Sequence, residues 1–327
     1  MRIVRGAPAQ LTHTFVVGET PTDSTEDVTV AATDARGDSA GSGIATSAGA
    51  DTGQYLFTLP AAAAVARLAV AWTGTIAGAE VVETDYVDVV GARMFSLPEA
   101  RDSDSSLDLV KVPTGKLAAA RDAVEEAVER ITDRAWTRSY ARVVLDGSGT
   151  SELILTHPLP DRSARDVRVI RSATIAPRVD GTPVALTGAQ LGALAVADDG
   201  TVRRTDGAAW TEGRSNITVE YEYGLDAAPA ELVAAALIHL RALIHRPKSA
   251  IPDRAESYTA SDGSTYRLTL PGPYATGIPS VDAVYHGYSE RPQAAPPGAA
   301  ESARIGRPAS ATLDYTPQRY SLFHGFR

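Results

Sequence analysis

Residues 113–136 read PTGKLAAARDAVEEAVERITDRAW, and this stretch decides the class of fold. Its apolar residues recur at steps of three and four, which is the period of a helix with one buried face. The apolar stripe consists of Leu117, Val124, Val128, Ile131 and Ala135. The other face carries Arg121, Asp122, Glu125, Glu126, Glu129 and Arg130. We predict an amphipathic helix that begins at Pro113-Thr114, ends near Trp136, and leaves its charged face to solvent or to a neighbouring subunit.

The segment that follows this helix is rich in strand signals. Residues 141–145 and 152–156 flank the turn-forming sequence Asp146-Gly-Ser-Gly149, which predicts a hairpin. Residues 166–170 alternate in the manner of another strand, and residues 216–223 (NITVEYEY) form the strongest strand pattern of the chain. We therefore expect a β-rich insertion that ends at Gly224.

A second helix is predicted after this insertion. Pro229 suits the first helical position, and Arg246-Pro247 ends the pattern. The apolar positions are Leu232, Val233, Ala236, Leu237, Leu240, Leu243 and Ile244. Further on, Asp262-Gly263 lies between two short strand patterns and predicts a hairpin, and residues 279–288 have enough apolar content for a short helix.

The two ends of the chain differ from this centre. Residues 1–95 alternate apolar and polar residues in short runs separated by Gly, Ser, Asp and Thr, which predicts an Ig-like β-sandwich. Residues 96–112 have the polar composition of a linker, and residues 113–288 form the predicted core. Residues 289–327 are rich in Pro, Ala and Gly and predict an extended C-terminal arm. The fold class is therefore α+β.

The arm ends in aromatic and basic side chains of the kind that dock on a partner protein. The candidate docking residues are Arg304, Arg307, Tyr315, Arg319, Tyr320, Phe323 and Phe326.

The composition of the 327 residues excludes several function classes. The net charge is −9, whereas proteins that wrap nucleic acid through its phosphates are normally basic. The absence of cysteine removes disulfides, thiolate metal sites and cysteine nucleophiles. Residues 1–15 lack the apolar core of a signal peptide, and the longest apolar run, near residues 60–70, is interrupted by Arg67. We expect neither secretion nor a membrane anchor.

No pattern in the chain predicts catalysis. The sequence lacks a GxSxG elbow, a phosphate-binding loop, an HExxH pair and a dinucleotide fingerprint. His239 and His245 do not have the spacing of a helical metal pair. The acidic clusters at Asp102-Ser-Asp104 and Asp198-Asp199 lack the rest of a calcium loop and are better explained by a linker and a turn. We predict a non-enzymatic protein without cofactor or metal; a wall hydrolase is the enzymatic alternative.

The order of elements over residues 110–290 resembles that of the bacteriophage head-tail connector family, which has a helical core with a β insertion. The matching segments are the helix 116–136, the predicted hairpin 141–156, the strand 216–223 with Gly224, the alanine-rich helix after Pro229, and the sequence GIPSVDAV at 277–284. The N-terminal sandwich departs from the minimal pattern and resembles the Ig-like decorations of virion proteins.

The resemblance implies a structural head-to-tail adaptor in the neck of a virion, assembled in the host cytoplasm. Such proteins form a ring, usually of twelve copies, beneath the portal protein. The ring continues the DNA channel towards a stopper or tail-completion protein, without sequence-specific DNA binding. The expected roles are portal docking for the arm and ring contacts for the helices. The ring-interface residues would be Leu117, Val124, Val128, Ile131, Leu237 and Leu240.

Two alternatives remain open at this point. A receptor- or carbohydrate-binding module could use aromatic residues of the sandwich, for which Tyr55, Trp72 and Tyr86 are the candidates, although we expect Trp72 to lie in the core. A repeat of arginines could face DNA or form salt bridges between subunits. It consists of Arg162, Arg165, Arg168 and Arg171.

Overall fold

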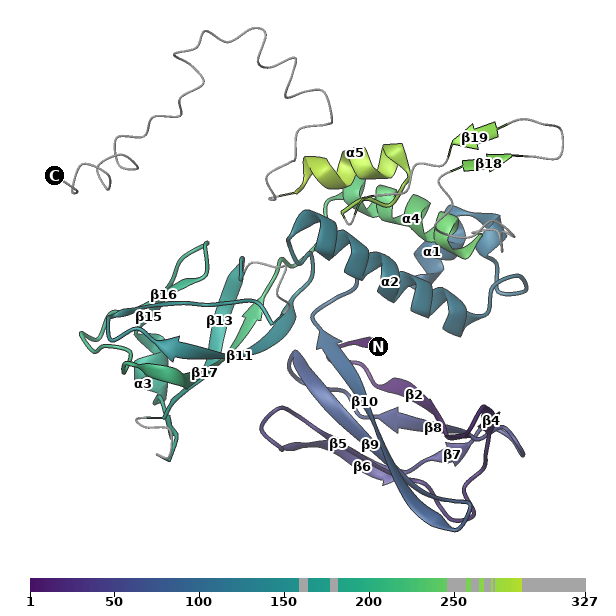
Figure 1. The fold of residues 1–327 in the computed structure, drawn as a ribbon, viewed down its shortest axis with the longest axis horizontal. Helices are drawn as coiled ribbons and strands as arrows, with labels where there is room; N and C mark the ends of the chain where they lie inside the picture. The colour runs from purple at the N-terminus through teal and green to yellow at the C-terminus, as the bar shows by residue number, and fades with distance from the viewer. Residues whose placement is uncertain are drawn as a thin grey trace, which may run out of the picture. The chain divides into compact units, whose positions relative to one another are not determined.

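The chain folds as an α+β protein in which a β-sandwich precedes a group of helices and an inserted pair of sheets (Figure 1). A computed structural model describes residues 1–158, 164–176, 182–245, 257–259, 265–267, 272 and 274–289. Buried hydrophobic side chains gather in three clusters, one for each of these parts. The fold class expected from the sequence is confirmed.

The N-terminal part is a sandwich of two antiparallel sheets with one parallel edge pairing. The larger sheet has the order β1-β10-β9-β5-β6 and the smaller one the order β2-β8-β7, with β3 and β4 paired as a short ribbon. The strands are β1 (Arg2–Val4), β2 (Ala9–Thr14), β3 (Val16–Val17), β4 (Thr20–Pro21), β5 (Thr29–Thr33), β6 (Ser39–Ile44), β7 (Thr46–Ser47), β8 (Gln54–Leu59), β9 (Ala66–Ile76) and β10 (Ala79–Val90).

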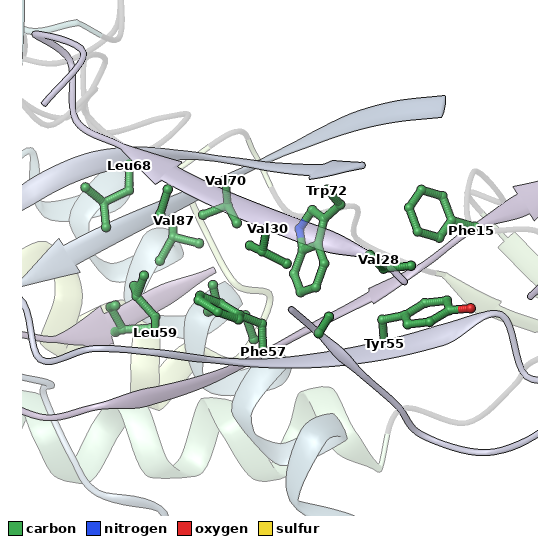
Figure 2. Close-up of a cluster of buried hydrophobic side chains, with 14 of the residues drawn as sticks. Phe15, Val28, Val30, Tyr55, Phe57, Leu59, Leu68, Val70, Trp72 and Val87 are labelled. Carbon is green, nitrogen blue, oxygen red and sulfur yellow. The ribbon is translucent and has the colours of Figure 1, made fainter. Parts of the chain in front are cut away.

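The alternation of apolar residues along these strands produces the core of the sandwich. Side chains at every second position point inward from both sheets, because successive residues of a strand face opposite sides. Trp72 of β9 is fully buried at the centre and meets Phe57 of β8 edge to face, with 6.4 Å between ring centroids (Figure 2). The expectation that Trp72 is a core residue is confirmed.

The pairing of β1 positions the charged residues discussed below. The chain reverses between β9 and β10 through Ala77 and Gly78, which both have positive φ, as a two-residue hairpin turn requires. Strand β10 then pairs antiparallel with β9 along nearly all of its length. Strand β1 pairs in parallel with the end of β10, with Arg2 opposite Asp88. The first residues of the chain therefore lie beside the segment that leads into the helices.

The helical core consists of α1 (Leu97–Ser103), the 3-10 turn η1 (Ser105–Leu107), α2 (Thr114–Thr132), α4 (Ala230–Ile244) and α5 (Pro279–Gly287). Helices α2, α4 and α5 lie side by side (Figure 1). The short helix expected over residues 279–288 is confirmed as α5. Helix α2 starts where the sequence predicts but ends at Thr132, because Asp133 adopts a left-handed conformation. Trp136 packs into the helical core from beyond the helix end.

The segment 96–112 is not the linker that its composition predicts. Ser96 and Glu99 form a capping box that starts α1, and the side chain of Asp104 caps η1. Ala100 and Leu107 are fully buried in the helical core, together with Met94 and Phe95 at the end of the predicted sandwich. The polar residues of this segment are therefore helix caps, and its few apolar residues belong to the core.

The insertion between α2 and α4 contains two sheets around one hydrophobic cluster. Their orders are β11-β17-β13-β14 and β12-β16-β15, and the cluster includes the fully buried Trp210. The elements are β11 (Ser139–Gly147), β12 (Glu152–Ile154), β13 (Val167–Ile175), β14 (Val184–Ala185), α3 (Gly188–Gly192), β15 (Leu194–Val196), β16 (Thr201–Arg204) and β17 (Gly213–Tyr223).

The predicted hairpin of residues 141–156 is wrong. Strand β11 pairs with β17, and β12 pairs with β16, so the two strands lie in different sheets. The backbone N–H of Gly149 donates to Trp210 O, and Trp210 N–H donates to Thr150 O. Asn216 Oδ1 accepts from Gly147 N–H at 2.9 Å. These distant partners take up the hydrogen bonds that a local turn would have used.

The described residues beyond α4 agree with the expected hairpin. Strands β18 (Ser257–Thr259) and β19 (Thr265–Arg267) pair antiparallel, with Tyr258 opposite Tyr266. Among the described residues, no helix combines the length and the apolar character needed to cross a bilayer.

Candidate functional site

The residues predicted for a ring interface lie in the chain's own core. Leu117, Val124, Val128, Ile131 and Leu240 are buried in the helical cluster, and Leu237 packs against it partly buried. The apolar stripe of α2 therefore meets other helices of the same chain. A ring contact made by these helices would have to use other faces. The seven docking residues predicted in the arm, from Arg304 to Phe326, lie outside the described residues.

The charged face of α2 is covered in part, which corrects the expectation that all of it meets solvent or a neighbour: Glu126 and Arg130 are exposed, but other residues of the face are not. Glu125 and Glu129 are only 1% and 3% exposed. Asp122, Glu125 and Glu129 follow each other at steps of three and four, so they share one side of the helix. Arginines from the N-terminal part cover that side.

Arg2 forms the first half of this junction. Its guanidinium makes a bidentate pair with Glu129, with Nη1 to Oε1 at 2.9 Å and Nη2 to Oε2 at 2.7 Å. Its backbone N–H donates to Asp122 Oδ2 at 3.1 Å. Burial lowers the pKa of Arg2, but the carboxylates of Glu129 and Glu125 raise it by more, so the net shift is upward. The guanidinium therefore stays charged.

Arg93 forms the second half. Its Nη1 donates to Glu125 Oε2 at 2.6 Å, and its Nη2 donates to Asp122 Oδ1 at 2.5 Å and to Arg2 O at 2.8 Å. The other oxygen of Glu125 accepts from Met94 N–H at 3.0 Å. Burial raises the pKa of Glu125 above its usual range, although Arg93 and this N–H oppose the shift. Arg93 and this N–H therefore favour the ionised carboxylate, against the larger effect of burial.

A second junction joins the sandwich to the inserted sheet. Glu220 of β17 is buried, and its Oε2 accepts from Arg36 Nε at 2.8 Å, from Arg36 Nη2 at 2.6 Å and from Ser172 Oγ at 3.0 Å. Arg142 of β11 donates from Nη1 to the backbone oxygen of Ala35. Burial and the charge of Glu220 raise the pKa of the neighbouring Tyr140.

Together, the two junctions attach the sandwich through three of its arginines, Arg2, Arg36 and Arg93. Their partners are carboxylates of α2 and β17. The carboxylates Glu125, Glu129 and Glu220 are buried, and removing the arginine partner of a buried charge is strongly destabilising. The two junctions therefore connect the sandwich to the helices and to the inserted sheet.

The described part of the arginine repeat is engaged within the chain. Arg168 Nε donates to Gly224 O at 3.0 Å, and Arg171 pairs with the buried Glu222. Arg165 also has a partner, and Arg162 lies outside the described residues. Nothing observed on the described residues supports either proposed role of the repeat, as a row that faces DNA or as salt bridges between subunits.

The aromatic residues that a glycan site would need are mostly inside the sandwich. Trp72 and Tyr55 are both buried in its core, and Figure 2 shows them among the other inward-pointing side chains. Tyr86 is 58% exposed, with the guanidinium of Arg67 5.1 Å from its ring centroid. Of the three candidates, one remains at the surface, which is too little for a stacking platform of several rings.

The acidic clusters act as caps and turns. Asp104 Oδ1 accepts from Ser106 N–H, and Asp199 Oδ1 accepts from Thr201 N–H. Within the described ranges, His, Asp and Glu side chains form no group of three that could hold a metal ion.

Sequence reasoning missed the junction arginines and the role of Glu125 and Glu129. A signal was present: three acids on one side of α2, spaced to face a single partner surface. That pattern indicates a covered acidic face only once the pairing of β1 with β10 is known.

Comparison with known proteins gives distant likenesses only. No family model matches the chain, and no curated protein matches it. Among solved structures, a chain from the neck of an empty GTA particle is 13% identical, covers 61% of this chain and 92% of its own, and has a TM-score of 0.37. A chain from the virion of a native gene transfer agent is 14% identical with the same coverage and a TM-score of 0.35. A tandem repeat from the extending region of a large adhesion protein is 15% identical, covers 67% of this chain and 50% of its own, and has a TM-score of 0.20. These TM-scores lie below 0.5, so the likenesses carry no functional argument.

Proposed function

We propose that this chain is a structural, non-enzymatic head-to-tail adaptor of a tailed bacteriophage. It forms a ring below the portal protein, continues the DNA channel, and joins the capsid to a stopper or tail-completion protein. Its place is the neck of the virion, after assembly in the host cytoplasm.

The observation that carries the proposal is the order of elements along the chain. Helix α2 is followed by the two-sheet insertion, then by α4, the β18–β19 pair and α5, and the helices on both sides of the insertion share one core. This is the order on which the resemblance to head-tail connectors rests, except that residues 141–156, matched there as a hairpin, belong to two different sheets. The order of elements does not by itself identify a function or a partner. The partners and the number of copies are therefore part of the proposal.

The charge of the chain is consistent with a channel through which DNA slides. A net charge of −9 disfavours tight, sequence-independent contact with phosphates. The ion-paired junctions also suit a ring subunit, because a heterologous contact closes into a ring only when the parts of each copy keep a fixed geometry.

The first test is the mass of the assembly. The purified full chain of 34.3 kDa should run in mass photometry as a ring, about twelve times heavier than one copy, either alone or after portal rings are added. A chain that stays monomeric and leaves the portal unbound would contradict the adaptor function.

The arm gives a second prediction. Truncation after Ala300 retains Ser289, whose Oγ donates to Ile131 O at 2.9 Å, and should abolish binding to portal rings without changing the thermal unfolding midpoint. Pull-down of portal rings measures the binding. As a matched pair, alanine at the four aromatics (Tyr315, Tyr320, Phe323, Phe326) should remove binding, whereas alanine at Arg304, Arg307 and Arg319 should mainly reduce its salt dependence. Undiminished binding by the truncated chain would remove the docking role.

A further inference from the structure

Most of strand β10 has a strand partner on one side only. It pairs with β9 along nearly all of its length, whereas β1 covers its other side only at residues 88–90. In the part of the chain that the structure describes, no other strand pairs with residues 79–87 on that side. We refer to residues 79–87 of β10 as the free edge.

The backbone of the free edge offers hydrogen bonds to a further strand. Asp88 N–H donates to Met1 O on the side of β1. Because the N–H and C=O groups of successive strand residues point to opposite sides, those of Tyr86, Thr84 and Val82 point to the same side as those of Asp88. These three residues make no backbone hydrogen bond there with any described residue. Such an edge is a template for strand addition.

The side chains along the free edge alternate between two kinds. Val82 and Tyr86 point away from the sandwich core and are 57% and 58% exposed. Glu83 and Asp85 point to the other side, where they flank His13 of β2. A strand added at this edge therefore meets an uncharged row on one of its faces and an acidic row on the other.

The acidic row keeps part of its charge available to a partner. His13 Nδ1 lies 2.8 Å from Asp85 Oδ2, and Nε2 lies 3.1 Å from Glu83 Oε2, so His13 contacts one oxygen of each carboxylate. The side chains of Glu83 and Asp85 are 42% and 48% exposed. Glu80, at the start of the free edge, is exposed as well. Three carboxylates against one histidine leave the edge negative even when His13 is protonated.

A hollow beside the free edge leads towards the sandwich core. Its volume is about 170 Å³, and its lining includes Leu11, Trp72, Asp85 and Val87. Trp72 and Val87 are among the inward-pointing side chains of Figure 2. Lysine and arginine lay their aliphatic stems on apolar surface while the charged end stays with polar groups. A basic side chain in this hollow therefore has apolar surface for its stem and Asp85 for its charge.

The same charges disfavour a second copy of this chain at the free edge. Inward-pointing charged residues on an edge strand protect a sheet against edge-to-edge pairing. Two copies paired through β10 would bring their acidic rows together, in a chain with a net charge of −9. A strand with basic side chains meets no such repulsion. The free edge is therefore better suited to a basic partner than to self-association.

We propose that the free edge binds an extended basic segment of a partner protein as an added β-strand. The segment alternates apolar side chains, which lie beside Val82 and Tyr86, with lysine or arginine, which reach Glu83 and Asp85. Backbone hydrogen bonds supply the affinity, and the alternation of side chains supplies the specificity. This gives the sandwich a binding role that does not depend on the adaptor function.

Hydrogen exchange of the full chain, followed by NMR, tests the added strand directly. The probe is a capped peptide of alternating lysine and valine that is as long as the free edge. The amides of Val82, Thr84 and Tyr86 should exchange quickly in the protein alone. With saturating peptide they should exchange at least about tenfold more slowly, because each then donates within a ladder. Binding that leaves these amides unchanged, or no binding at about 1 mM peptide, would overturn the proposal.

Thr84→Pro and Thr84→Val form a matched pair of variants. Proline removes an N–H that points to the open side and spares the bonds with β9, which come from Glu83 and Asp85, whereas valine keeps the N–H. Thr84→Pro should weaken peptide binding about tenfold or more, and Thr84→Val less than about twofold, in fluorescence anisotropy of a labelled peptide. Equal affinities of two folded variants would contradict strand addition. If Thr84→Pro does not fold, the exchange measurement decides.

Peptide controls and unliganded exchange separate the other occupants. A peptide with glutamate in place of lysine should not bind, and equal binding of the two peptides would contradict the role of Glu83 and Asp85. Slow exchange at the free edge without peptide would show that the edge is already occupied. If dilution then restores fast exchange, the occupant is a second copy, and if truncation after Ala300 restores it, the occupant is the C-terminal arm. Either result would overturn the basic partner.

Discussion

Arg93→Ala should lower the free energy of unfolding of the full chain by about 3–5 kcal/mol, as expected when a buried ion pair loses one partner. The side chain of Arg93 is only 8% exposed, and it reaches Glu125, Asp122 and the backbone oxygen of Arg2. Without it, the buried carboxylate of Glu125 keeps the N–H of Met94 and the more distant guanidinium of Arg2, whose Nη1 is 3.8 Å from Oε2. Urea unfolding followed by circular dichroism measures the loss. Arg241→Ala, which removes a solvent-screened pair with Asp104, should cost much less.

The pH dependence of this loss has a definite sign. Burial raises the pKa of Glu125 in the folded chain above its value in the unfolded chain. A group with a raised folded pKa contributes stability when protonated, and that contribution is lost as the pH rises through the folded pKa. Removal of Arg93 raises this pKa further, so the loss caused by Arg93→Ala should be larger at pH 8 than at pH 5.

Glu125→Gln in the Arg93→Ala background isolates the charge, because it removes the carboxylate but keeps the shape of the side chain. The double variant should recover part of the lost stability at pH 8. A loss by Arg93→Ala that is independent of pH, or no larger than that of Arg241→Ala, would mean that the junction does not hold the sandwich on the helices.

The helical part of the fold could be predicted because its signals are local. The apolar residues from Leu117 to Ile131 recur at the helical period and are buried on one side of α2. Pro113 occupies the N-cap of this helix. The end of α2 was placed four residues too late, because the left-handed conformation of Asp133 has no counterpart in the period of apolar residues.

The failures at the predicted hairpin and at the charged face of α2 share one cause, which is partners far apart in the sequence. Gly147 and Asn216 are 69 residues apart, and their hydrogen bond helps direct β11 away from β12. Arg2 and Glu129 are 127 residues apart, so a face of α2 that looks solvated from its own sequence is covered by the first strand. Local periodicity identifies which residues form a face but not what covers it.

The segment 96–112 illustrates the same limit. Its polar composition predicts a linker, yet Arg101 donates to Leu107 O and to Val112 O and so joins two residues that are buried in the helical core.

Gly224→Ala should destabilise the chain by about 2–6 kcal/mol, the second large effect. Gly224 has a φ of +98°, which L side chains rarely adopt, and a Cβ there would lie 2.4 Å from the backbone oxygen of Thr137 and 3.0 Å from Ala135 Cβ. Backbone strain of about 1–3 kcal/mol adds to overpacking of about 1–3 kcal/mol, because a backbone oxygen cannot move aside as a flexible side chain can.

Gly207→Ala separates the two contributions. Gly207 also has a positive φ, of +77°, but a Cβ there would meet nothing within 4 Å, so this variant carries the strain alone and should cost about 1 kcal/mol. Urea unfolding of both variants, read by tryptophan fluorescence, measures the difference between them. Equal losses would show that the clash with Thr137 is relieved by small movements.

The position of Gly224 explains why the larger loss should affect the whole chain. Its N–H donates to Asp166 O and its carbonyl accepts from Arg168 beside the inserted sheet, while the next residue, Leu225, donates to Ala135 O beyond the end of α2. A side chain at this point pushes the inserted sheet away from the helical core. Gly224→Ala should therefore lower the urea midpoints of the inserted sheet and of the helical core together. A lower midpoint for the inserted sheet alone would show that this connection transmits no stability between the two.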